Sequence, residues 1–400
     1  MTTVSGKDFL ADMLDDDSDV ATPSRTGGAN LHFTIKRFAL QILLEKAVTV
    51  VPNRDSSMAV LKHFRFEVTP QRLQVVATDL ELSMLATTEM VTVTQPGIAV
   101  FPARKMLDIV READDGDVDI HVVNGLAQIT IARTTWNLRL VGGQDYPPMP
   151  DTTEVAFATV DRVAFLDALN AVRYAASRET TRPSLMMIDI AKGTMTACDG
   201  ARFQQATFGD FPLDIQIPIG AVDDLIKLLR AIDLPEISVG EADNHIVFRL
   251  GTDVFCANKL MAQFPDMAAM LLRPALENKH RLIVDRGELL DAVKRVRINA
   301  DQETSAIGLQ LDNNTLTVIA RDKFGNAATE AIGVEWSGPE RRFVVNHAFL
   351  TDMIGMHAGR SCSFWLGDDT KSRKSPLLLR DDDAGTVGVV QQMNLSWVGL

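Results

Sequence analysis

Clustered aspartates are the first residues whose types and spacing suggest chemistry. They occur at residues 15–17, 114–117 and 381–383. Grouped carboxylates can hold a hard cation, but each cluster lies in a tail or an expected turn without periodic apolar partners. Nucleotide-binding, dinucleotide-binding and serine-hydrolase glycine motifs are absent from the sequence, and the seven histidines are scattered. The sequence therefore predicts no catalytic residue, no metal and no cofactor, with a carboxylate-metal enzyme left as an alternative.

A second set of aspartates indicates how the chain is organised. Asp79, Asp199 and Asp322 each end an apolar, strand-like segment, and they lie 120 and 123 residues apart. Aspartate suits such a position because its side chain can bond nearby backbone amides in a turn. A period of this size is that of a domain, so the sequence predicts one module written three times.

Helical patterns before and after each aspartate support the repeat. Apolar residues recur at three-to-four spacing in the segments before it, and at +4, +7 and +8 from Pro102, Pro218 and Asn346 after it. The first set is Phe38, Ile42, Leu43; Phe165, Leu166, Leu169; and Leu289, Leu290, Val293, Val296. The second set is Met106, Ile109, Val110; Val222, Leu225, Ile226; and Leu350, Met353, Ile354. Two helices with several antiparallel strands per unit define an α+β fold of three repeated domains.

Composition sets the limits of these domains. Hydrophobic residues make up 46% of the 400 positions, which is ample for three cores over residues 31–153, 154–278 and 279–400. Residues 1–30 carry six aspartates against Lys7 and Arg25 and are expected to form a disordered acidic tail. No apolar stretch approaches a membrane span, the N-terminus lacks the layout of a secretory signal, and three scattered cysteines build no disulfide framework. An intracellular protein without a membrane partner is expected.

Basic residues gather on the expected helices although the whole chain is acidic, with a formal net charge of −13. Binding to nucleic acid by bulk charge would need clustered cations. The residues in question are Arg104, Lys105 and Arg111; Arg162 and Arg173; Lys227 and Arg230; and Lys294, Arg295 and Arg297. Each one alone suits a solvated helix surface, but their recurrence in all three units favours a shared role.

Several short motifs occur in an order and spacing that resemble the bacterial DNA polymerase III β sliding clamp family. They are Ala-Thr-Asp-Leu-Glu at residues 77–81, Pro-Ala-Arg-Lys at 102–105 followed by Asp108, Ile109 and Arg111, Asp-Gly-Ala-Arg at 199–202, and Phe-Pro-Asp at 264–266. The resemblance runs from about residue 31 to 395, and the threefold repeat is itself that family's architecture. Only the acidic tail lies outside it.

The resemblance implies a head-to-tail homodimer, a six-domain ring with helices inside and sheets outside that encircles double-stranded DNA. A closed ring needs only weak, sequence-independent phosphate contacts, which explains how an acidic protein can act on DNA. The implied DNA-binding residues are Arg54, Arg104, Lys105, Arg173, Arg178, Arg182, Lys227, Arg230, Lys294 and Arg297.

Ring closure needs a strand edge of the first unit to pair with the third unit of the other chain. The resemblance matches Trp136 and Leu138 to apolar interface residues of the family, with Ile298 as the counterpart on the third unit. The alternation of Trp136, Leu138 and Leu140 suits a buried face equally well, so a core role for Trp136 stays open.

The family binds the short peptides of its partners in an apolar pocket between the second and third units. The matching positions here are Leu185, Cys198, Gly200, Arg202, Phe203, Pro265, Met270 and residues Gln391, Gln392, Met393, Asn394 and Leu395. Packing alone would also explain most of these residues. Two departures stand out: Ala269 replaces a pocket arginine, and Gln391-Gln-Met-Asn-Leu395 replaces the usual Met-Pro-Met-Arg-Leu ending.

The function implied is that of a non-catalytic processivity factor. It would tether the DNA polymerase catalytic subunit to its template, be opened by a clamp-loader ATPase, and be cytoplasmic and nucleoid-associated. A divergent clamp-fold scaffold or decoy, bound to other factors through the altered pocket, remains the alternative from a different class.

Overall fold

The computed structural model describes residues 30–53, 58–368, 375–394 and 396 of the chain. The predicted acidic tail up to residue 29, together with Arg54, Leu395 and residues 397–400, lies outside the described residues.

One order of elements occurs three times along the chain. Each unit begins with a strand and a first helix. Four or five strands follow, the last of which leads into a second helix, and three strands end the unit. The first unit comprises β1 (Leu31–Lys36), α2 (Arg37–Ala47), β2 (His63–Val68), β3 (Leu73–Thr78), β4 (Leu82–Thr88), β5 (Val91–Gln95), β6 (Gly97–Pro102), α3 (Ala103–Glu112), β7 (Asp117–Val123), β8 (Leu126–Ile131) and β9 (Thr134–Arg139).

The second and third units repeat this order with small variations. The second comprises β10 (Phe157–Asp161), α4 (Arg162–Val172), β11 (Met187–Ala191), β12 (Thr194–Cys198), β13 (Arg202–Thr207), β14 (Ile215–Pro218), α5 (Ile219–Ala231), β15 (Glu236–Glu241), β16 (His245–Leu250) and β17 (Asp253–Asn258). The third comprises β18 (His280–Asp285), α7 (Arg286–Val296), β19 (Ala306–Asp312), β20 (Thr315–Arg321), β21 (Ala327–Gly333), β22 (Glu335–Trp336), β23 (Arg341–Asn346), α8 (His347–Met356), β24 (Ser361–Leu366), β25 (Leu377–Asp381) and β26 (Thr386–Val390). The predicted α+β fold of three repeated modules is confirmed.

The three aspartates act as predicted, because each closes the turn between two strands. Asp79 Oδ1 accepts from the amides of Glu81 and Leu82 at 2.9 and 2.6 Å. Asp199 Oδ1 accepts from the two matching amides of its own turn, both at 2.9 Å. Asp322 does the same at 2.9 Å in a turn that is one residue longer. The repeat is thus built on one recurring side-chain-to-backbone bond.

Sheets run across the boundaries between units. An eight-stranded sheet joins the first unit to the second through antiparallel pairing of β4 with β17. A nine-stranded sheet joins the second to the third through β13 and β26. Two sheets stay within single units, namely β5-β1-β7-β8-β9 in the first and β21-β20-β19-β23 in the third. The units are therefore held together by continuous strand pairing.

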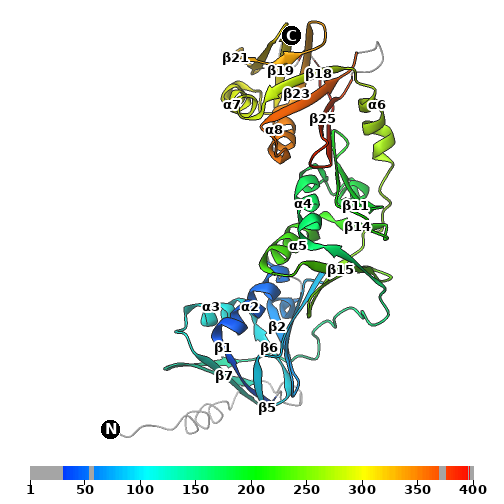
Figure 1. The fold of residues 1–400 in the computed structure, drawn as a ribbon. Helices are drawn as coiled ribbons and strands as arrows, with labels where there is room; N and C mark the ends of the chain where they lie inside the picture. The colour runs from blue at the N-terminus through cyan, green and yellow to red at the C-terminus, as the bar shows by residue number, and fades with distance from the viewer. Residues whose placement is uncertain (1–29, 54–57, 369–374, 395, 397–400) are drawn as a thin grey trace.

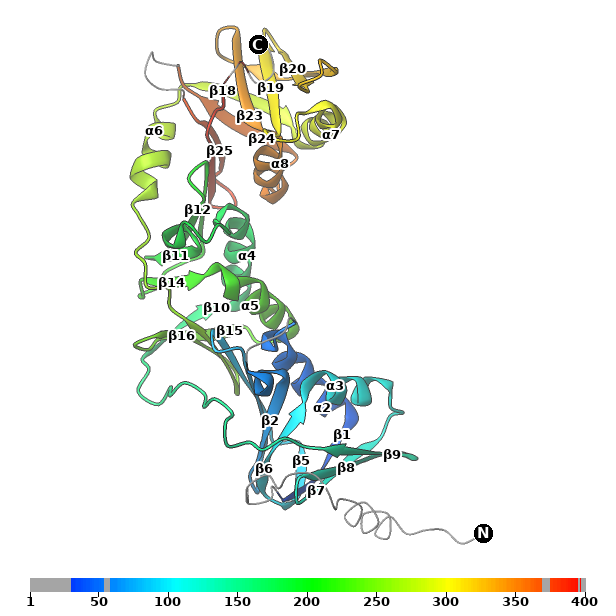
Figure 2. The same cartoon turned by 180° about the vertical axis from the view of Figure 1, so that it is seen from behind.

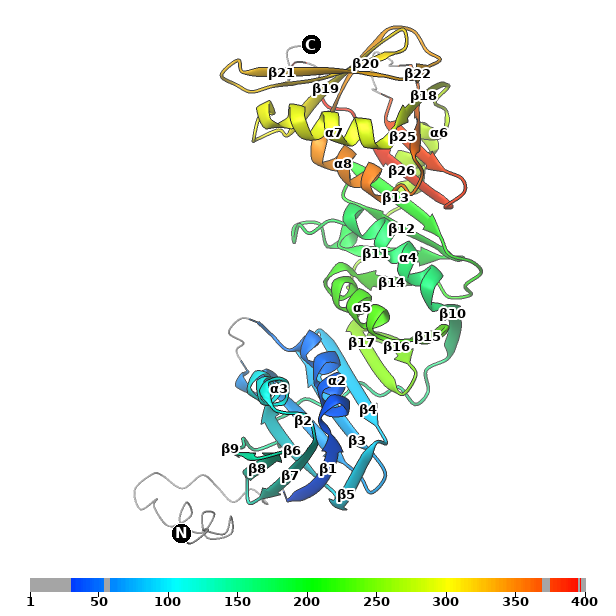
Figure 3. The same ribbon diagram turned by 60° about the vertical axis from the view of Figure 1, so that its left-hand side comes forward.

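The helices lie along the inner side of a curved chain. Helices α2, α3, α4, α5, α7 and α8 follow one side, whereas the sheets and the short α6 (Arg273–Leu276) lie on the other, as Figures 1 and 2 show from opposite directions. Figure 3 brings the helical side forward. This arrangement presents the polar faces of all three helix pairs to the same side.

The predicted apolar faces are confirmed for the second helices and wrong in part for α2. The stripes of α3, α5 and α8 are buried. Phe38 and Ile42 are each 49% exposed, whereas α2 packs through Leu40, Leu43 and Leu44. This helix has two apolar stripes. The strands cover the stripe of Leu40, Leu43 and Leu44, whereas Phe38 and Ile42 lie on the opposite side.

Candidate functional site

Cations of the first unit lie at the exposed side of α3. Arg104 and Lys105 are both exposed in the first turn of this helix. The guanidinium of Arg104 donates to the side-chain oxygen of Asn53. Later in the helix, Arg111 pairs with Glu45 of α2 at 3.0 Å. The helix thus offers positive charge near its start, where neither cation is paired with an acid among the described residues.

Two predicted DNA contacts of the second unit share one acid. Arg173 and Arg178 bind the two carboxylate oxygens of Asp223 in α5, at 2.6 and 3.1 Å. Partial burial would raise the pKa of Asp223, but the hydrogen bonds and charges of Arg178 and Arg173 outweigh it and hold this pKa below its usual range. The pair of arginines is therefore fixed in place and half-neutralised.

The remaining helix cations are less constrained. Lys227 reaches Asp224 at 2.8 Å on the exposed side of α5, and Arg230 donates to Asn170 of α4 at 3.1 Å. In the third unit, Lys294 and Arg297 line a cavity of about 220 Å³ between α7 and α8. Exposed ion pairs of this kind are weak and easily exchanged for other anions.

Arg182 departs from the predicted group. Its guanidinium donates to the backbone oxygen of Asp199 at 3.2 Å and lies 3.7 Å from the carboxylate of Glu179. The structure thus places Arg182 beside the turn that carries the predicted partner pocket.

The predicted pocket residues fall into a buried set and an exposed set. Leu185, Cys198 and Phe203 form a small apolar cluster with Met267 and Leu271 of the segment that links the second and third units. Burial raises the pKa of the Cys198 thiol to about 12. The exposed or half-buried members around this cluster are Gly200, Pro265, Met270, Gln391, Gln392, Met393 and Asn394. The structure therefore brings the two sets together at one junction.

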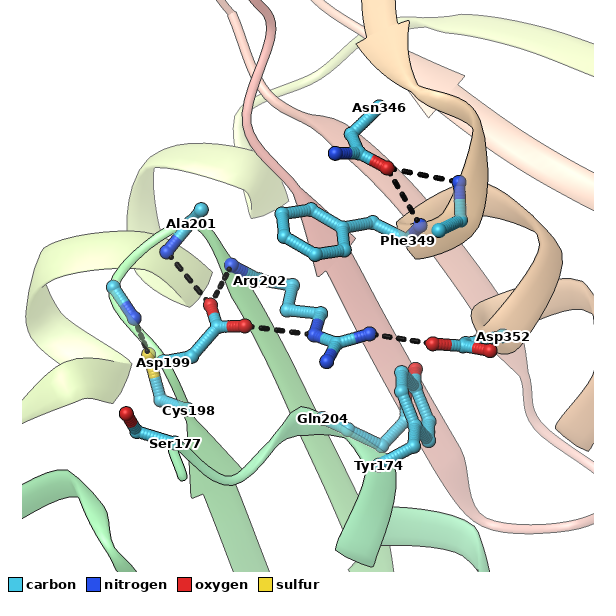
Figure 4. A network of polar contacts seen from close by, with 12 residues as sticks. Tyr174, Ser177, Cys198, Asp199, Ala201, Arg202, Gln204, Asn346, Phe349 and Asp352 are labelled. Atoms are coloured by element: carbon cyan, nitrogen blue, oxygen red, sulfur yellow. Dashed lines mark hydrogen bonds and ion pairs between the residues drawn. The ribbon is translucent and has the colours of Figure 1, made fainter. Parts of the chain in front are cut away.

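Arg202 joins the second and third units at this junction (Figure 4). Its side chain bonds Asp199 at 2.8 Å and Asp352 of α8 at 2.6 Å. The guanidinium carbon also lies 4.4 Å from the ring centroid of Phe349 and 5.3 Å from that of Tyr174. The resemblance matches Arg202 to the partner pocket, but these contacts already engage its guanidinium within the chain. Asp352 and Phe349 escaped prediction because nothing in the sequence pairs a residue of α8 with a turn 150 positions earlier.

The C-terminal segment runs along the same junction. The amide of Gln391 donates to Ala201 at 2.9 Å and that of Met393 to Val344 at 2.7 Å. The side-chain amide of Gln392 donates to the backbone oxygen of Ser375. Residues 391–393 therefore extend the strand pairing beyond β26 and border the apolar cluster.

Two edge strands within the described ranges, β9 and β21, lack the cross-unit partner that their counterparts in the other units have. Among the described strands, β9 pairs only with β8, and β21 only with β20. On β9, Trp136 is half-buried against the core of the first unit, and Leu138 is only 4% exposed. Leu138, which the resemblance matches to the interface, is buried in the single chain because this face of β9 points into the unit. Ile298 of the third unit is 82% exposed, as an interface residue of a lone chain would be.

Aspartates of the two described clusters are engaged within the chain. Asp115 and Asp117 pair with Arg37 and Lys36, and Asp381 forms a buried pair with His357 at 2.8 Å. Within the described ranges, no three His, Cys, Asp or Glu side chains are arranged to hold a metal ion. No helix in the described part of the chain is long and apolar enough to cross a membrane.

Sequence models of a known family match both ends of this repeat. Residues 31–150 match the DNA polymerase III beta subunit, N-terminal domain, and residues 274–392 match its C-terminal domain. The chain belongs to the DNA polymerase III beta subunit family. The beta sliding clamp of Pseudomonas aeruginosa is 27% identical over 388 residues, covering 91% of this chain and all of the relative. That of Chlamydia muridarum is 25% identical over 88% of this chain and 100% of its own length.

Solved beta subunits share the fold. The structure of the DNA polymerase III subunit beta from Pseudomonas aeruginosa superposes with a TM-score of 0.83 at 24% identity, over 91% of this chain and 100% of that one. The Bacillus subtilis sliding clamp gives a TM-score of 0.82 at 19% identity, over 91% and 99%. The sliding clamp fold predicted from the sequence is thus confirmed.

Proposed function

We propose that this beta subunit acts as a sliding clamp, a ring of two chains that encircles duplex DNA and tethers a replicative polymerase to it. The chain contributes no catalytic step, and any polymerase activity belongs to its partner. The observation that carries the proposal is that, in the described part of the chain, β9 and β21 of the first and third units lack the cross-unit partner that the equivalent strands β17, β26, β4 and β13 have.

The repeat itself indicates how two chains close. Each joined sheet pairs the strand after the turn aspartate of one unit with the last strand of the next unit, β4 with β17 and β13 with β26. The strands left over are β21 of the third unit and β9 of the first. Pairing them between two copies unites a four-stranded and a five-stranded sheet into nine strands, the size of the sheet between the second and third units. Doing so twice closes a ring without a free edge of this kind.

The register of the new pairing follows from the joined ones. Leu82, Arg202 and Asn326 occupy the same place, because each accepts from the amide of its turn aspartate. Leu82 pairs with Ala257, and Ala257 corresponds to Leu138, since β8–β9 and β16–β17 turn with the same register. Asn326 is therefore opposite Leu138 of the second copy.

Continuing this register pairs Ala327 with Asn137 and Ala328 with Trp136 of the second copy. Ala328 packs against the core of the third unit and Trp136 against that of the first. The two side chains therefore face the same side of the joined sheet, a small residue opposite a large one.

The place of Ile298 supports the same junction. Tyr174 follows α4 at the position where Ile298 follows α7, and Tyr174 packs at the boundary of the second and third units, where its hydroxyl donates to Gln204 at 2.7 Å. Burial raises the pKa of Tyr174 above its usual range. A second copy would cover Ile298 as the third unit covers Tyr174.

In such a ring the six helix pairs line the hole, and the cations of the helical side meet phosphates. Weak, exchangeable contacts suit a protein that must slide, because strong ones would hold it at one position. We assign this role to Arg104, Lys105, Arg173, Arg178, Lys227, Arg230, Lys294 and Arg297. Because the clamp slides on duplex DNA, we place the protein at the nucleoid.

We assign peptide binding to the junction of the second and third units, where apolar and backbone-exposing residues lie beside the linking segment. Its partners are a polymerase catalytic subunit and a clamp-loader ATPase, since a closed ring must be opened. The engaged Arg202 favours partners whose charge does not depend on an arginine contact. The amides at 391 and 392 weaken the burial of an apolar anchor beside them.

The test is retention on DNA. The protein is loaded on nicked circular DNA with a loader and ATP, washed in high salt, and the circle is then cut. Retention before cutting and loss after it are the expected results. Loss during the wash by a dimer, with a loader proven active on another clamp, would overturn the proposal and favour a scaffold or decoy that binds through the altered pocket.

A further inference from the structure

The turn between β20 and β21 carries an exposed aromatic residue. Phe324 is 81% exposed, and Lys323 beside it is held by Glu303 at 2.8 Å. The first two units make this turn in four residues, from Asp79 to Leu82 and from Asp199 to Arg202, whereas the third uses five. The additional residue places a phenyl ring at the edge of the molecule, a costly position for a large apolar side chain that stays in water.

The corresponding turns in the chain meet the end of the next unit's last strand. In the first unit, Asn258 donates from its backbone to Glu81 at 2.8 Å and from its side chain to Leu80 at 2.8 Å. In the second, Gln391 donates its amide to Ala201 at 2.9 Å. Asn258 and Gln391 both correspond to Arg139, which ends β9.

From these contacts we infer that Phe324 is an anchor between the two chains of the ring, packed on residues 139–141 of the second copy; this inference rests on the proposed ring. The register that sets Asn326 opposite Leu138 sets Phe324 opposite Leu140. The phenyl ring of Phe324 then lies between the aliphatic part of the Arg139 side chain and Val141 of the second copy.

The receiving surface has room for it. Val141 is 45% exposed although it bridges to Val100 of β6. It lines a cavity of about 300 Å³ together with Ala59, Val60 and His63. An exposed valine beside an open cavity offers an aromatic ring apolar contact on two sides.

The occupant is a second copy rather than a foreign protein because the surface continues the open edge of β9. Any chain that pairs with this edge in the inferred register brings its own β20–β21 turn to residues 139–141. Neither joined boundary within the chain has an aromatic residue in its turn, since residues 80–81 are Leu and Glu and residues 200–201 are Gly and Ala. Phe324 is thus specific to the junction between chains.

The experiment measures the dimer dissociation constant by sedimentation, for the wild type and for Phe324→Ala, Val141→Ala and the double variant. Losing a buried aromatic contact should raise the constant about tenfold per junction, hence roughly a hundredfold for a ring that contains it twice. Val141→Ala should raise the constant less. The free-energy change of the double variant should be smaller than the sum of the two single changes, because both substitutions remove the same contact. Met261→Ala, which removes another exposed apolar side chain (96% exposed), should leave the constant unchanged.

The outcomes separate the two proposals. A wild type that stays monomeric at all concentrations would overturn the ring and this inference together. A dimeric wild type, with an unaltered constant for Phe324→Ala and no coupling to Val141→Ala, would overturn the anchor alone. An unchanged thermal unfolding midpoint shows that an altered constant does not come from a misfolded variant.

Discussion

At the scale of single residues, the guanidinium of Arg202 links two units that are otherwise joined by backbone pairing. Two carboxylates and two aromatic rings surround it, from both sides of the boundary. Its removal would leave Asp199 without its charge partner at the edge of an apolar cluster. A partly buried ion pair adds little net stability, but breaking one side of it is costly.

Arg202→Ala is therefore expected to loosen the boundary of the second and third units, at a cost of about 2–3 kcal/mol. Hydrogen exchange should be faster for the amides of β13 and β26, which pair across that boundary. Arg380→Ala, which removes an exposed pair with Asp382, serves as the control and should leave these amides protected. Unchanged protection in Arg202→Ala would show that strand pairing alone holds the boundary.

Asp223 limits the positive charge of the helical side, because its one carboxylate pairs with both Arg173 and Arg178. Asp223→Asn should free both arginines and raise affinity for linear duplex DNA by about two- to fivefold at low salt, with the gain fading as salt increases. Asp167→Asn removes the same charge from the exposed side of α4, where no ion pair to it occurs among the described residues. Equal gains from both variants would mean that net charge alone matters and that the arginine pair has no special role.

Single residues were the hardest features to predict from the sequence. The sequence singles out the cations because they recur on three helix pairs, and the pocket residues because short motifs of the resemblance carry them. Their partners could not, since Asp223 and Asp352 are ordinary exposed acids until the fold brings them to arginines 50 and 150 positions away. The resemblance matched Leu138 to the interface, and the alternation of β9 buries this side chain in the single chain.

At the scale of elements, the turn after β20 depends on an ionised Asp322. The side-chain amide of Asn326 and the backbone amides of the turn lower the pKa of this carboxyl. A lowered folded-state pKa means that the stabilisation is complete above the ordinary value near 3.8 and is lost as pH falls through the folded-state value.

Asp322→Ala should therefore lower the urea midpoint of unfolding at pH 7, and its difference from the wild type should shrink as the pH falls below about 4. Glu340→Ala, which removes an exposed carboxylate 3.8 Å from Arg342, is the matched control. A difference that stays constant with pH would mean that the turn does not require the charge.

The end of α7 offers a cleaner test of the interface than the buried Leu138. Ile298→Asp changes a side chain that the lone chain leaves in water, so the fold should be unaffected. Placing a charge in the inferred junction should raise the dimer dissociation constant by roughly a hundredfold or more, as sedimentation would detect. Leu138→Ala should instead lower the thermal stability of the first unit through its core. A fully dimeric Ile298→Asp would rule out this residue as part of the junction.

Elements were easier to predict than residues because they depend on periodic patterns. The turn aspartates and the second helices of each unit follow the predicted spacing closely. Helix α2 is the exception, since Phe38 and Ile42 form an apolar stripe of their own and only the covering strands decide which stripe is buried. The sheets that cross unit boundaries could not be read from spacing, because pairing partners such as β13 and β26 are about 180 residues apart.

At the scale of the whole molecule, the same strand pairing joins neighbouring units twice within the chain, β4 with β17 and β13 with β26, and in the proposed ring it joins β21 to β9 of the second copy. The first and third units present the edge strands β9 and β21, and the helices line the inner side of the curve (Figure 1). An acidic protein with cations on the helices of that side can enclose DNA without binding it tightly. Topology then supplies the retention that affinity does not.

The most direct test of this account is a covalently closed ring. Cysteines at Asn137 and Ala327 face each other between chains in the inferred register, and the native Cys198, Cys256 and Cys362 are buried. After loading on nicked circular DNA and oxidation, the double variant should remain on the circle through denaturant and leave when the DNA is cut. Cysteines at 137 and 331, four residues out of register, should not form the bond. Failure of the 137–327 pair to cross-link in a dimer, or release of the linked ring from intact circles, would contradict the account.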